Sequence, residues 1–341
     1  MSSLHYPEPD ILIMRYYFYI ILFLIPGYIF GQDIHFSNTQ ANLQFINPSL
    51  SANPGTDNRI GIQYRNQGRS ISSPYQTYGC WMEKTIHPRF LKNDVAGYSI
   101  IATHDNAGDG DLQQTRIMLG GSYAKNLYEG KLFVALGYAF GITNRSVNYS
   151  ALLFPSQWNG NSFDPGLPQQ EAYKNSSFFY PDMSAGISVH ALLSKSISLL
   201  AGLSLDHITE PKETFYTGEN RLGRKINLHG SIHIASGRTQ YTPGVIYTNQ
   251  SGSYELLMGS NFSTTIGSVA LKYGIWYRWN RDLIPIIGIK ANRYELIMAY
   301  DVNVGTMHQA TLYMGGMEIS LAIHLSNHKT DKYDCEEMEF E

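Results

Sequence analysis

The segment from His104 to Asp111 reads HDNAGDGD and carries the side-chain oxygens that a calcium ion prefers. Calcium loops of the EF-hand kind place oxygen ligands on alternate residues and end in a glutamate, and this segment lacks that arrangement. Glycine and aspartate at this density are also typical of ordinary turns. We therefore predict a turn here and no metal site.

Other motifs that carry chemistry are missing from the sequence. Neither GxSxG nor HExxH occurs, and the 11 histidines are scattered without paired spacing. A surface lipase would need a Ser, a His and an Asn or Asp brought together, and no spacing picks out such a set. Of the two cysteines, Cys80 lies in a strand-like run and Cys335 in an acidic tail, which does not indicate a disulfide framework. We predict a protein that is not an enzyme, with no catalytic residues, no metal and no cofactor.

Isolated charges instead alternate with apolar residues along strand-like runs. From Arg293 to Leu325 the apolar side chains fall on nearly every second position, which indicates strands with one apolar and one polar face. The polar faces hold Gly, Ser, Asn and Ala, whereas a soluble sandwich would be richer in Lys and Glu. The 341 residues include 31 Gly and 25 Tyr, and only 16% are charged. This composition is typical of a membrane β-barrel with its polar residues inside and its apolar residues facing lipid.

The runs number about fourteen, an even number as a closed antiparallel barrel requires. We predict strands at Asn58–Gln67, Tyr75–Lys84, Asp94–Thr103, Leu112–Lys125, Lys131–Thr143, Asp182–Leu193, Ser196–Asp206, Arg224–Ala235, Gln240–Thr248, Ser253–Ser260, Ile266–Arg278, Leu283–Lys290, Arg293–Asn303 and Leu312–Leu325. The fold class is therefore all-β, a transmembrane antiparallel barrel spanning 58–325 in the outer membrane, and the first and last strands pair to close it. Tyr294, Tyr300 and Tyr313 are candidate anchors at the lipid interface.

The lengths of the connections support this topology. If both ends of the chain are periplasmic, the odd-numbered connections are extracellular and should be the long ones. The longest are Arg145–Pro181, His207–Gly223 and Val304–Thr311, all odd-numbered. The even-numbered connections are tight, except for Thr85–Asn93.

Two terminal segments fall outside the barrel. Residues 1–31 read as a signal peptide, because Arg15 precedes an apolar run from Tyr16 to Phe30, with Met14 as an alternative start. A membrane anchor helix is the less favoured interpretation, since the run is shorter than the ~20 residues that span a bilayer. Residues 326–341 form an acidic tail that we expect to be solvated, with a periplasmic docking role as the alternative.

Residues 32–57 show no alternation, yet they hold Phe36 and Phe45 among turn signals. We hypothesise that this segment packs into the lumen or its periplasmic mouth as a plug. Charged side chains on the inward faces are expected to form lumenal ion pairs, since charges facing lipid are costly. These are Arg116, Asp206, Lys272, Arg278, Glu295, Asp301 and Glu318. The net charge of −3 and the lack of a basic patch exclude a nucleic-acid partner.

A series of short motifs occurs along the chain in a characteristic order. They are Gln32-Asp33, Phe36-Ser37, Asn47-Pro48-Ser49, Tyr64-Arg65-Asn66-Gln67, Phe154-Pro155-Ser156-Gln157, Pro181-Asp182 entering a Gly186 strand, His207 with Pro211, Trp276-Tyr277-Arg278, Ala299-Tyr300-Asp301 and Glu318-Ile319-Ser320-Leu321. In order and spacing they resemble the PorP/SprF family of type IX secretion system membrane proteins over nearly all of the mature chain. The chain departs from the family pattern at Ser49, Gly68 and Met317.

The resemblance implies an outer-membrane barrel that assists the export or surface anchoring of a large secreted protein such as an adhesin. Implied partners are that protein, the periplasmic ring and peptidoglycan-linking components of the system, and outer-membrane lipid. The candidate structural or partner-binding residues are Phe36, Asn47, Pro48, Arg65, Asn66, Gln67, Phe154, Gln157, Arg278, Tyr300, Asp301 and Glu318. The alternative function is a diffusion channel or a transporter of hydrophobic compounds, whose lumen would conduct a small solute.

Overall fold

The computed structural model describes residues 33–39, 41–52, 58–70, 73–87, 93–171 and 173–325. The expected signal peptide and acidic tail lie outside the described residues. The chain divides into two units, Met1–Asp33 and Ile34–Glu341, and the strands among the described residues belong to the second.

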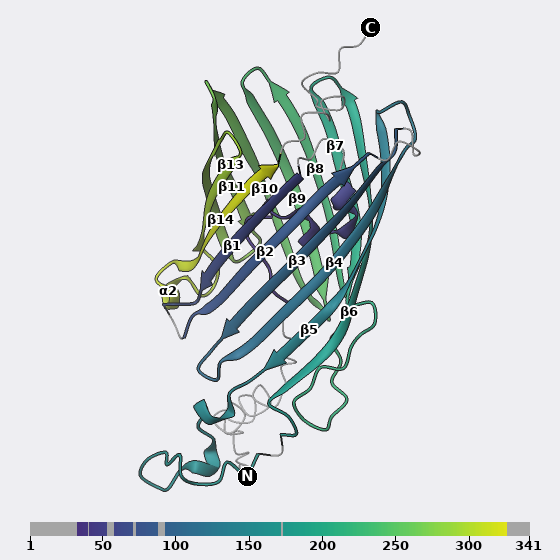
Figure 1. The fold of residues 1–341 in the computed structure, drawn as a ribbon. Coiled ribbons are helices and arrows are strands. Elements are labelled where there is room, and N and C mark those ends of the chain that lie inside the picture. The colour runs from purple at the N-terminus through teal and green to yellow at the C-terminus, as the bar shows by residue number, and fades with distance from the viewer. Residues whose placement is uncertain are drawn as a thin grey trace, which may run out of the picture. The chain divides into compact units, whose positions relative to one another are not determined.

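Fourteen antiparallel strands close into one barrel, in which each strand pairs with its neighbours in sequence and β1 pairs with β14 (Figure 1). The strands are β1 (Asn58–Gln67), β2 (Tyr75–Ile86), β3 (Val95–Ala107), β4 (Leu112–Asn126), β5 (Leu132–Ser146), β6 (Ser177–Ser194), β7 (Ile197–Asp206), β8 (Lys225–Ser236), β9 (Thr239–Gln250), β10 (Ser253–Ile266), β11 (Val269–Arg278), β12 (Asp282–Ala291), β13 (Tyr294–Asn303) and β14 (Met314–Leu325). The closing register sets Asn58 opposite Leu325 and Gln67 opposite Gly316. The predicted all-β class, the strand number and the closure are confirmed.

The outer face of the barrel is apolar. Ile62, Leu136 and Ile287 are each about 60% exposed, at 59%, 61% and 64%, and similar side chains follow on alternate positions of the other strands. A belt of exposed apolar side chains is unfavourable in water and favourable in hydrocarbon, so this face meets lipid. In the part of the chain that the structure describes, no helix is long and apolar enough to cross a membrane.

Several predicted strand limits are wrong. β6 begins at Ser177 rather than Asp182, because the aromatic residues before Pro181 pair with β5. β10 continues to Ile266 rather than Ser260, since its Asn, Ser and Thr residues still pair with β9 and β11. β3 runs on to Ala107, so the predicted turn at His104–Asp111 is confined to four residues.

The last connection also departs from the prediction. A one-turn helix α2 (His308–Thr311) precedes β14, and Leu312 and Tyr313 follow it with positive φ of 53° and 61°. Residues in this left-handed conformation cannot continue a strand. The strand therefore starts at Met314 and not at Leu312.

The two ends of the barrel differ in their connections. One end, here called the tight-turn end, carries two-residue turns such as Gly237-Arg238 and Gly267-Ser268, whose glycines have positive φ of 58° and 61°. The other, the long-loop end, carries residues 147–176, 207–224 and 304–313 and lies at the bottom of Figure 1. Short turns face the periplasm and long loops face outward in outer-membrane barrels, which orients the chain.

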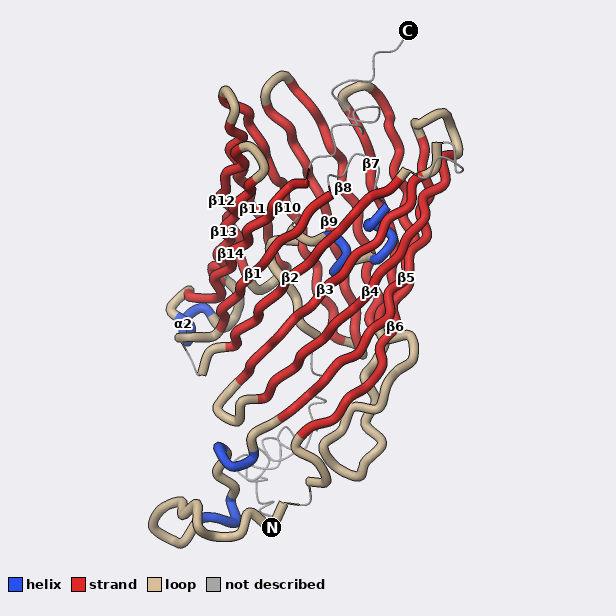
Figure 2. The backbone as a smooth tube through the Cα atoms, in the orientation of Figure 1, coloured by secondary structure: helices blue, strands red, loops and turns tan. Residues whose placement is uncertain are grey.

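Residues 34–39 and 41–52, here called the lumenal segment, lie among the inward side chains. The segment contains two 3-10 helices, η1 (Leu43–Phe45) and η2 (Pro48–Ala52), which appear in blue within the ring of strands in Figure 2. Its path runs from Ser37, beside the long-loop ends of β13 and β14, to Ser51, whose hydroxyl lies 3.0 Å from that of Ser99 near the tight-turn end of β3.

Candidate functional site

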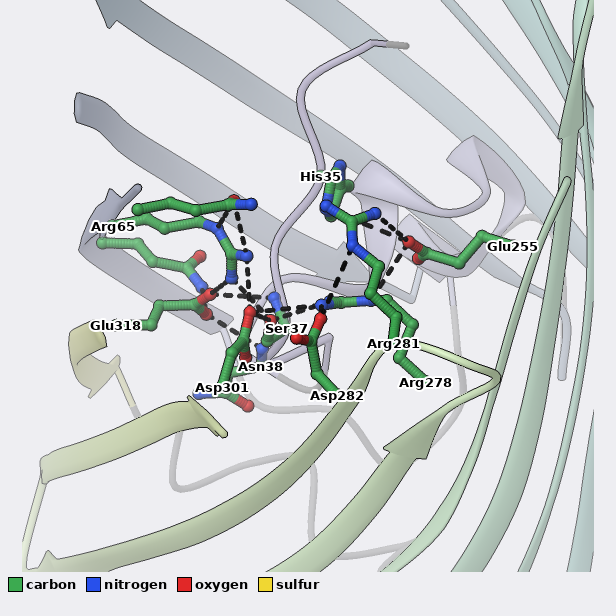
Figure 3. A network of polar contacts seen from close by, with 12 residues as sticks. His35, Ser37, Asn38, Arg65, Glu255, Arg278, Arg281, Asp282, Asp301 and Glu318 are labelled. Carbon is green, nitrogen blue, oxygen red and sulfur yellow. Dashed lines mark hydrogen bonds and ion pairs between the residues drawn. The ribbon is translucent and has the colours of Figure 1, made fainter. Parts of the chain in front are cut away.

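The start of the lumenal segment is bound by the carboxylate of Glu318, an inward residue of β14. The backbone N–H of Ser37 donates to Glu318 Oε2 at 2.8 Å, and that of Asn38 donates to Oε1 at 2.9 Å (Figure 3). The Asn38 side chain donates to Ser320 Oγ at 3.1 Å, one inward position further along β14. Hydrogen bonds to an ionised acceptor are about twice as strong as neutral ones, so this carboxylate fixes two successive peptide groups.

The hydroxyl of Ser37 makes every hydrogen bond that a hydroxyl can make. It donates to Asp301 Oδ2 at 3.0 Å and accepts from Arg65 Nη1 at 2.5 Å and Arg278 Nη2 at 2.9 Å. A serine has one donor and two acceptor lone pairs, so no capacity is left over. Ser37 is only 1% exposed, so its hydroxyl is buried among these three partners.

Two buried arginines link the acidic residues around Ser37. Arg65 Nη2 lies 2.6 Å from Asp301 and its Nη1 lies 3.0 Å from Glu318. Arg278 Nη1 lies 2.7 Å from Asp282 and 3.1 Å from Asp301, and its Nε lies 3.0 Å from Glu255. Buried charges persist only when they are paired and hydrogen-bonded. We call Arg65, Arg278, Asp301 and Glu318, with Glu255 and Asp282, the charged clamp.

The clamp extends toward the long-loop mouth through Arg281 and His35. Arg281, in the turn between β11 and β12, lies 3.6 Å from both Glu255 and Asp282. His35 Nε2 lies 3.9 Å from Glu255. Burial lowers the pKa of His35 to about 4, so this imidazole is neutral at pH 7.

The middle of the lumenal segment is held by neutral groups on the opposite side of the lumen. Asn47, which is fully buried, has its Nδ2 within 3.2 Å of the backbone oxygens of Ile187 and Leu203 and 3.1 Å from His229 Nε2. Its Oδ1 accepts the backbone N–H of Ser49 at 2.9 Å, and the Ser49 hydroxyl lies 2.8 Å from that of Ser188. Amide and hydroxyl groups here do what carboxylates and guanidinium groups do in the clamp.

Glycines on β5, β6 and β7 make room for this contact. A Cβ at Gly137 would overlap the Ser49 backbone, and a Cβ at Gly186 would overlap the Asn47 side chain. Gly202 is similarly close to His229 and Asn47. Glycine in a strand interior weakens the strand and marks a close approach of another backbone. We call Gly137, Gly186 and Gly202 the glycine cradle.

Further ion pairs line the lumen away from the segment. Arg116 lies 3.0 Å from Asp182, which also lies 2.9 Å from His207 Nδ1. Two of the other inward charges that alternation singled out also have partners: Asp206 lies 3.4 Å from Lys225, and Glu295 lies 2.9 Å from His324 Nε2. The ion pair expected for Lys272 is not found among the described residues, where Lys272 has only a longer-range electrostatic interaction with Glu295. Inward placement of these charges agrees with the lipid-facing outer wall.

The structure brings together only part of the set of residues that the sequence motifs singled out. Arg65, Arg278, Asp301 and Glu318 meet in the clamp, and Gln67 accepts from Arg65 Nη2 at 3.0 Å. In a second group, Phe36 packs edge-on against Phe45 with ring centroids 5.1 Å apart, while Asn47 and Pro48 enter the cradle.

The remaining residues of that set lie elsewhere. Gln157 is buried in the loop 147–176, where its side chain caps the turn by accepting from Phe154 N at 3.0 Å. Asn66 donates to the Tyr64 hydroxyl at 3.0 Å, and Tyr300 is 39% exposed on the lipid-facing side. These positions stabilise local structure or face lipid and do not contact the lumenal segment in the hydrogen bonds described.

Sequence reasoning missed several residues of the site. Asp282 was assigned to a connection, and Glu255 was passed over although it stands on the inward face of β10. Ser37 was visible beside Phe36 in a motif, but nothing in the sequence marked its hydroxyl as the centre of a network. Within the described residues, no group of three or more His, Cys, Asp or Glu side chains is arranged to hold a metal ion.

At the tight-turn end, Asp94 anchors the connection between β2 and β3. Its carboxylate accepts from Lys125 Nζ at 2.8 Å and from the backbone N–H of Asn126 at 2.9 Å, and also from the Tyr123 hydroxyl. The hydrogen bonds from Lys125 and Tyr123 lower the pKa of Asp94 to about 2. Asp94 therefore ties the start of β3 to the end of β4.

Comparison with solved structures finds other barrels at low identity. The toluene transporter TodX of P. putida aligns over 83% of this chain and 93% of its own, with 10% identity and a TM-score of 0.49. The toluene transporter TbuX of Ralstonia pickettii aligns over 82% and 91%, with 11% identity and a TM-score of 0.48. A FadL homologue of Pseudomonas aeruginosa aligns over 87% and 94%, with 12% identity and a TM-score of 0.46.

Comparison by sequence is more specific. No protein of curated function matches the chain. The profile of a family described as type IX secretion system membrane protein PorP/SprF matches residues 29–322, which include every strand but the last three residues of β14. The chain therefore belongs to the PorP/SprF family of type IX secretion system membrane proteins and is an outer-membrane β-barrel.

Proposed function

We propose that this barrel is a plugged scaffold of the type IX secretion system, which assists export or surface anchoring of a large secreted protein such as an adhesin. The lumenal segment is the plug, and partners are recognised at the rims and the long loops. Family membership supports a role in the secretion system. We further propose that the exported protein is a large secreted protein such as an adhesin. The other proposed partners are the periplasmic ring and peptidoglycan-linking components of the system.

The observation that carries the plug is the double anchoring of one segment on two sides of the lumen. The charged clamp binds Ser37 and Asn38 from β1, β11, β13 and β14, while the glycine cradle binds Asn47 and Ser49 from β5 to β7. The four anchored residues of the segment, Ser37, Asn38, Asn47 and Ser49, are all buried. A segment held on both walls in this way resists displacement better than one tethered at a single point.

The long loops offer a surface for partners. Residues 147–176 and 207–224, here called the outer lobe, fold together: the backbone N–H of Lys174 donates to Phe215 O at 2.9 Å, and Tyr149 packs edge-on against Phe215 with ring centroids 6.3 Å apart. The rings of Tyr149 and Tyr173 stack at 3.6 Å. A folded lobe keeps its side chains in fixed positions, as a recognition surface requires.

Exposed aromatic side chains stand on this lobe. Trp158 and Phe163, which contact each other edge-on at 5.1 Å, are 49% and 46% exposed. Aromatic residues are enriched at protein interfaces and dominate their binding energy. We propose that this pair contacts the exported protein or its carrier outside the membrane.

Single-channel recording in planar bilayers tests the plug. The purified full-length protein should give no steady conductance, whereas a variant lacking residues 34–52 should conduct. Conductance of this variant also serves as the control that the barrel inserts into the bilayer. A steady open conductance of the unaltered protein would contradict the plug and favour the second candidate, a diffusion channel. The observation behind that candidate is a polar cavity of about 260 Å³ that remains beside the segment.

A secretion assay in the native host tests the outer lobe. The double variant Trp158→Ser/Phe163→Ser should reduce the amount of adhesin displayed at the cell surface and leave the amount of folded barrel unchanged. The matched control is Tyr254→Ser, which removes an aromatic side chain that is 63% exposed at the same end of the barrel but outside the lobe. Equal loss of display in both variants would contradict recognition by the lobe.

A further inference from the structure

The long-loop end of β6 has one side that no other strand covers among the described residues. β5 pairs with β6 as far as Ser177, whereas β7 pairs with β6 only from Ala185 onward. Residues 177–183, here called the open edge, are therefore paired on the side of β5 and unpaired on the side where β7 would continue. A strand edge of this kind is a template on which another chain can pair.

His207 directs the chain away from the open edge. It follows β7 directly and has a positive φ of 56°, a conformation in which a strand cannot continue. Its buried imidazole lies 2.9 Å from Asp182 on the inward face of β6. The loop after it stays on the inner side, where Phe215 packs edge-on against Phe178 with ring centroids 4.8 Å apart. The wall therefore loses β7 as a neighbour before β6 ends.

The pairing with β5 determines which backbone groups point to the open edge. The backbone N–H of Val147 donates to Ser176 O at 2.9 Å, which makes these two residues a hydrogen-bonded pair. In an antiparallel ladder such pairs alternate, so the even-numbered residues of this part of β6 bond to β5 and the odd-numbered residues point the other way. Met183 agrees with this alternation, because its carbonyl accepts from Ile208 N at 3.1 Å on the side away from β5.

The backbone groups that remain on the open edge are the N–H and C=O of Ser177, the N–H and C=O of Phe179, and the C=O of Pro181. Among the described residues, no hydrogen-bond partner for them is found. Proline is confined to positions of a sheet where no ladder partner needs its missing N–H, and Pro181 occupies such a position. An incoming strand can therefore exchange both hydrogen bonds with Ser177 and Phe179 and donate one to Pro181.

The open edge stands beyond the lipid-facing band. The outward side chains level with it on the neighbouring strands are polar: Asn144 of β5 lies opposite Phe179, and Thr115 of β4 lies opposite Asn144. Unpaired backbone groups are costly in hydrocarbon and are tolerated in water. Ser177 follows directly on the loop 147–176, so the edge adjoins the outer lobe. The Phe179 side chain is 69% exposed on the outer face.

We propose that the open edge binds an extended segment of the secreted protein by strand addition. The incoming segment occupies the place that β7 leaves vacant beyond His207. In this mode of recognition main-chain hydrogen bonds supply affinity, and alternate side chains such as Phe179 supply specificity. The inference rests on the proposed function for the identity of the partner, and it adds the form in which that partner is recognised.

The geometry favours this occupant over a second copy of the barrel. Strands of outer-membrane barrels tilt by roughly 35–45°, so two copies related by an axis along the membrane normal would bring their β6 strands together at roughly 70–90°. Neighbouring strands of one sheet differ in direction by only about 20–25°. Two open edges at the larger angle cannot share a ladder, whereas an extended segment of another protein can align with the edge.

Proline substitution tests the backbone contact. Phe179→Pro removes the central N–H of the open edge and leaves the ladder with β5 intact, because Phe179 and Asn144 form a non-hydrogen-bonded pair. In the native host, the amount of adhesin displayed at the cell surface should fall about tenfold, since one hydrogen bond is lost and proline disfavours pairing. Phe179→Val is the matched control. It keeps the N–H and a good strand former, so display should stay within about twofold of the parent.

Parent-level display in Phe179→Pro would overturn the inference. An equal loss in Phe179→Val would overturn it as well, because the contact would then depend on the aromatic ring and not on the backbone. The amount of folded barrel in the outer membrane is measured for each variant. If Phe179→Pro does not assemble, Ser177→Pro replaces it, since proline is tolerated at the first residue of a strand. Display in Ser177→Pro should fall likewise, and parent-level display would overturn the inference.

Photo-crosslinking gives an independent measurement with every backbone group in place. A photoreactive amino acid in place of Phe179 should join a segment of the adhesin on irradiation of cells, as identified by mass spectrometry. The same amino acid in place of Thr115, two strands away from the edge, should not. No adduct at position 179, or an adduct with a second copy of the barrel, would overturn the inference.

Failure of the proposed function has a different signature. In that case neither Trp158→Ser/Phe163→Ser nor Phe179→Pro reduces display. A loss of display in Trp158→Ser/Phe163→Ser alone would overturn strand addition at the open edge and leave recognition by the outer lobe standing.

Discussion

The charged clamp and the glycine cradle hold the same segment by different physics. At the clamp, a ring of four carboxylates and two guanidinium groups surrounds Ser37, and every charge depends on its neighbours (Figure 3). At the cradle, the contact with Asn47 and Ser49 uses neutral hydrogen bonds and the absence of side chains at three glycines. The clamp holds the lumenal segment by charge, and the cradle holds it by shape.

This difference predicts how each anchor fails. Loss of one charge in the clamp leaves its partners buried and unpaired, so the effect spreads through the network. Added bulk in the cradle acts only on the groups that lie against each glycine, such as the Ser49 backbone at Gly137 and the Asn47 side chain at Gly186. The clamp is therefore the anchor that is more sensitive to a change of charge, and the cradle is more sensitive to a change of side-chain volume.

The largest expected effect follows removal of Arg278. Arg278→Ala leaves Glu255, Asp282 and Asp301 without this shared cation, so unfolding in lipid vesicles should be easier by about 3–5 kcal/mol. Urea titration followed by tryptophan fluorescence measures this change. Lys212→Ala is the control, because Lys212 pairs with Glu219 in an exposed loop, where such pairs contribute about 1 kcal/mol or less. Similar losses in both variants would contradict the burial of the clamp charges.

A smaller effect is expected from neutralising Glu318. Glu318→Gln weakens the hydrogen bonds to the Ser37 and Asn38 backbones and the pairing with Arg65, at a cost of about 1.5–3 kcal/mol. A cysteine placed at Phe36 should then react faster with a soluble maleimide, while a cysteine at Leu50 stays protected. Faster reaction at both positions would show that the two anchors act as one. All labelling uses a background without the natural cysteines.

Bulk in the cradle should give the opposite labelling pattern. Gly137→Val forces a side chain into the Ser49 backbone, at a cost of about 1–3 kcal/mol, and should expose a cysteine at Leu50 but not one at Phe36. Gly218→Val is the control, because open space surrounds Gly218 in its loop. If the anchors are independent, the two losses of folding stability should add. The free energy of unfolding of the double variant Glu318→Gln/Gly137→Val should then fall by the sum of the two single-variant losses, within about 0.5 kcal/mol.

The smallest effect concerns Asp94, which lies outside both anchors. Its pKa is lowered from 3.8 to about 2, so its hydrogen bonds stabilise the fold above pH 4 and this contribution is lost as the pH falls toward 2. Asp94→Asn should remove this part of the acid dependence and leave labelling at Phe36 and Leu50 unchanged. The midpoint of thermal unfolding, measured between pH 4 and pH 2, tests the first expectation. An unchanged acid dependence in the variant would contradict it.

The fold was largely predictable because a barrel wall repeats every two residues. Alternation located all fourteen strands, and its inward charges included Arg278, Asp301 and Glu318. The prediction failed at strand ends such as Asn261–Ile266 in β10, where a polar strand interior and a turn have the same composition. There the hydrogen bonds to β9 and β11 decide whether a residue belongs to the strand or to the turn. These bonds form only when the neighbouring strands are in place.

The candidate site was less predictable than the wall. The family resemblance marked four residues of the charged clamp, but it equally marked Tyr300 and Asn66, which do not contact the lumenal segment in the hydrogen bonds described. A motif reports that a residue type recurs at a position, and it does not distinguish a lumenal contact from a lipid-facing or turn-stabilising role. The face of the strand and the register of its pairing make that distinction.

By itself, the sequence determined an all-β outer-membrane barrel with a polar lumen, because side-chain direction in a strand is a local property of the backbone. Only the tertiary structure decided that Ser37 meets Glu318, 281 residues away, and that Gly137 and Gly186 leave room for the segment that contains Asn47. Both contacts require the barrel to be closed in one register, since a shift of one residue would turn each inward side chain toward lipid.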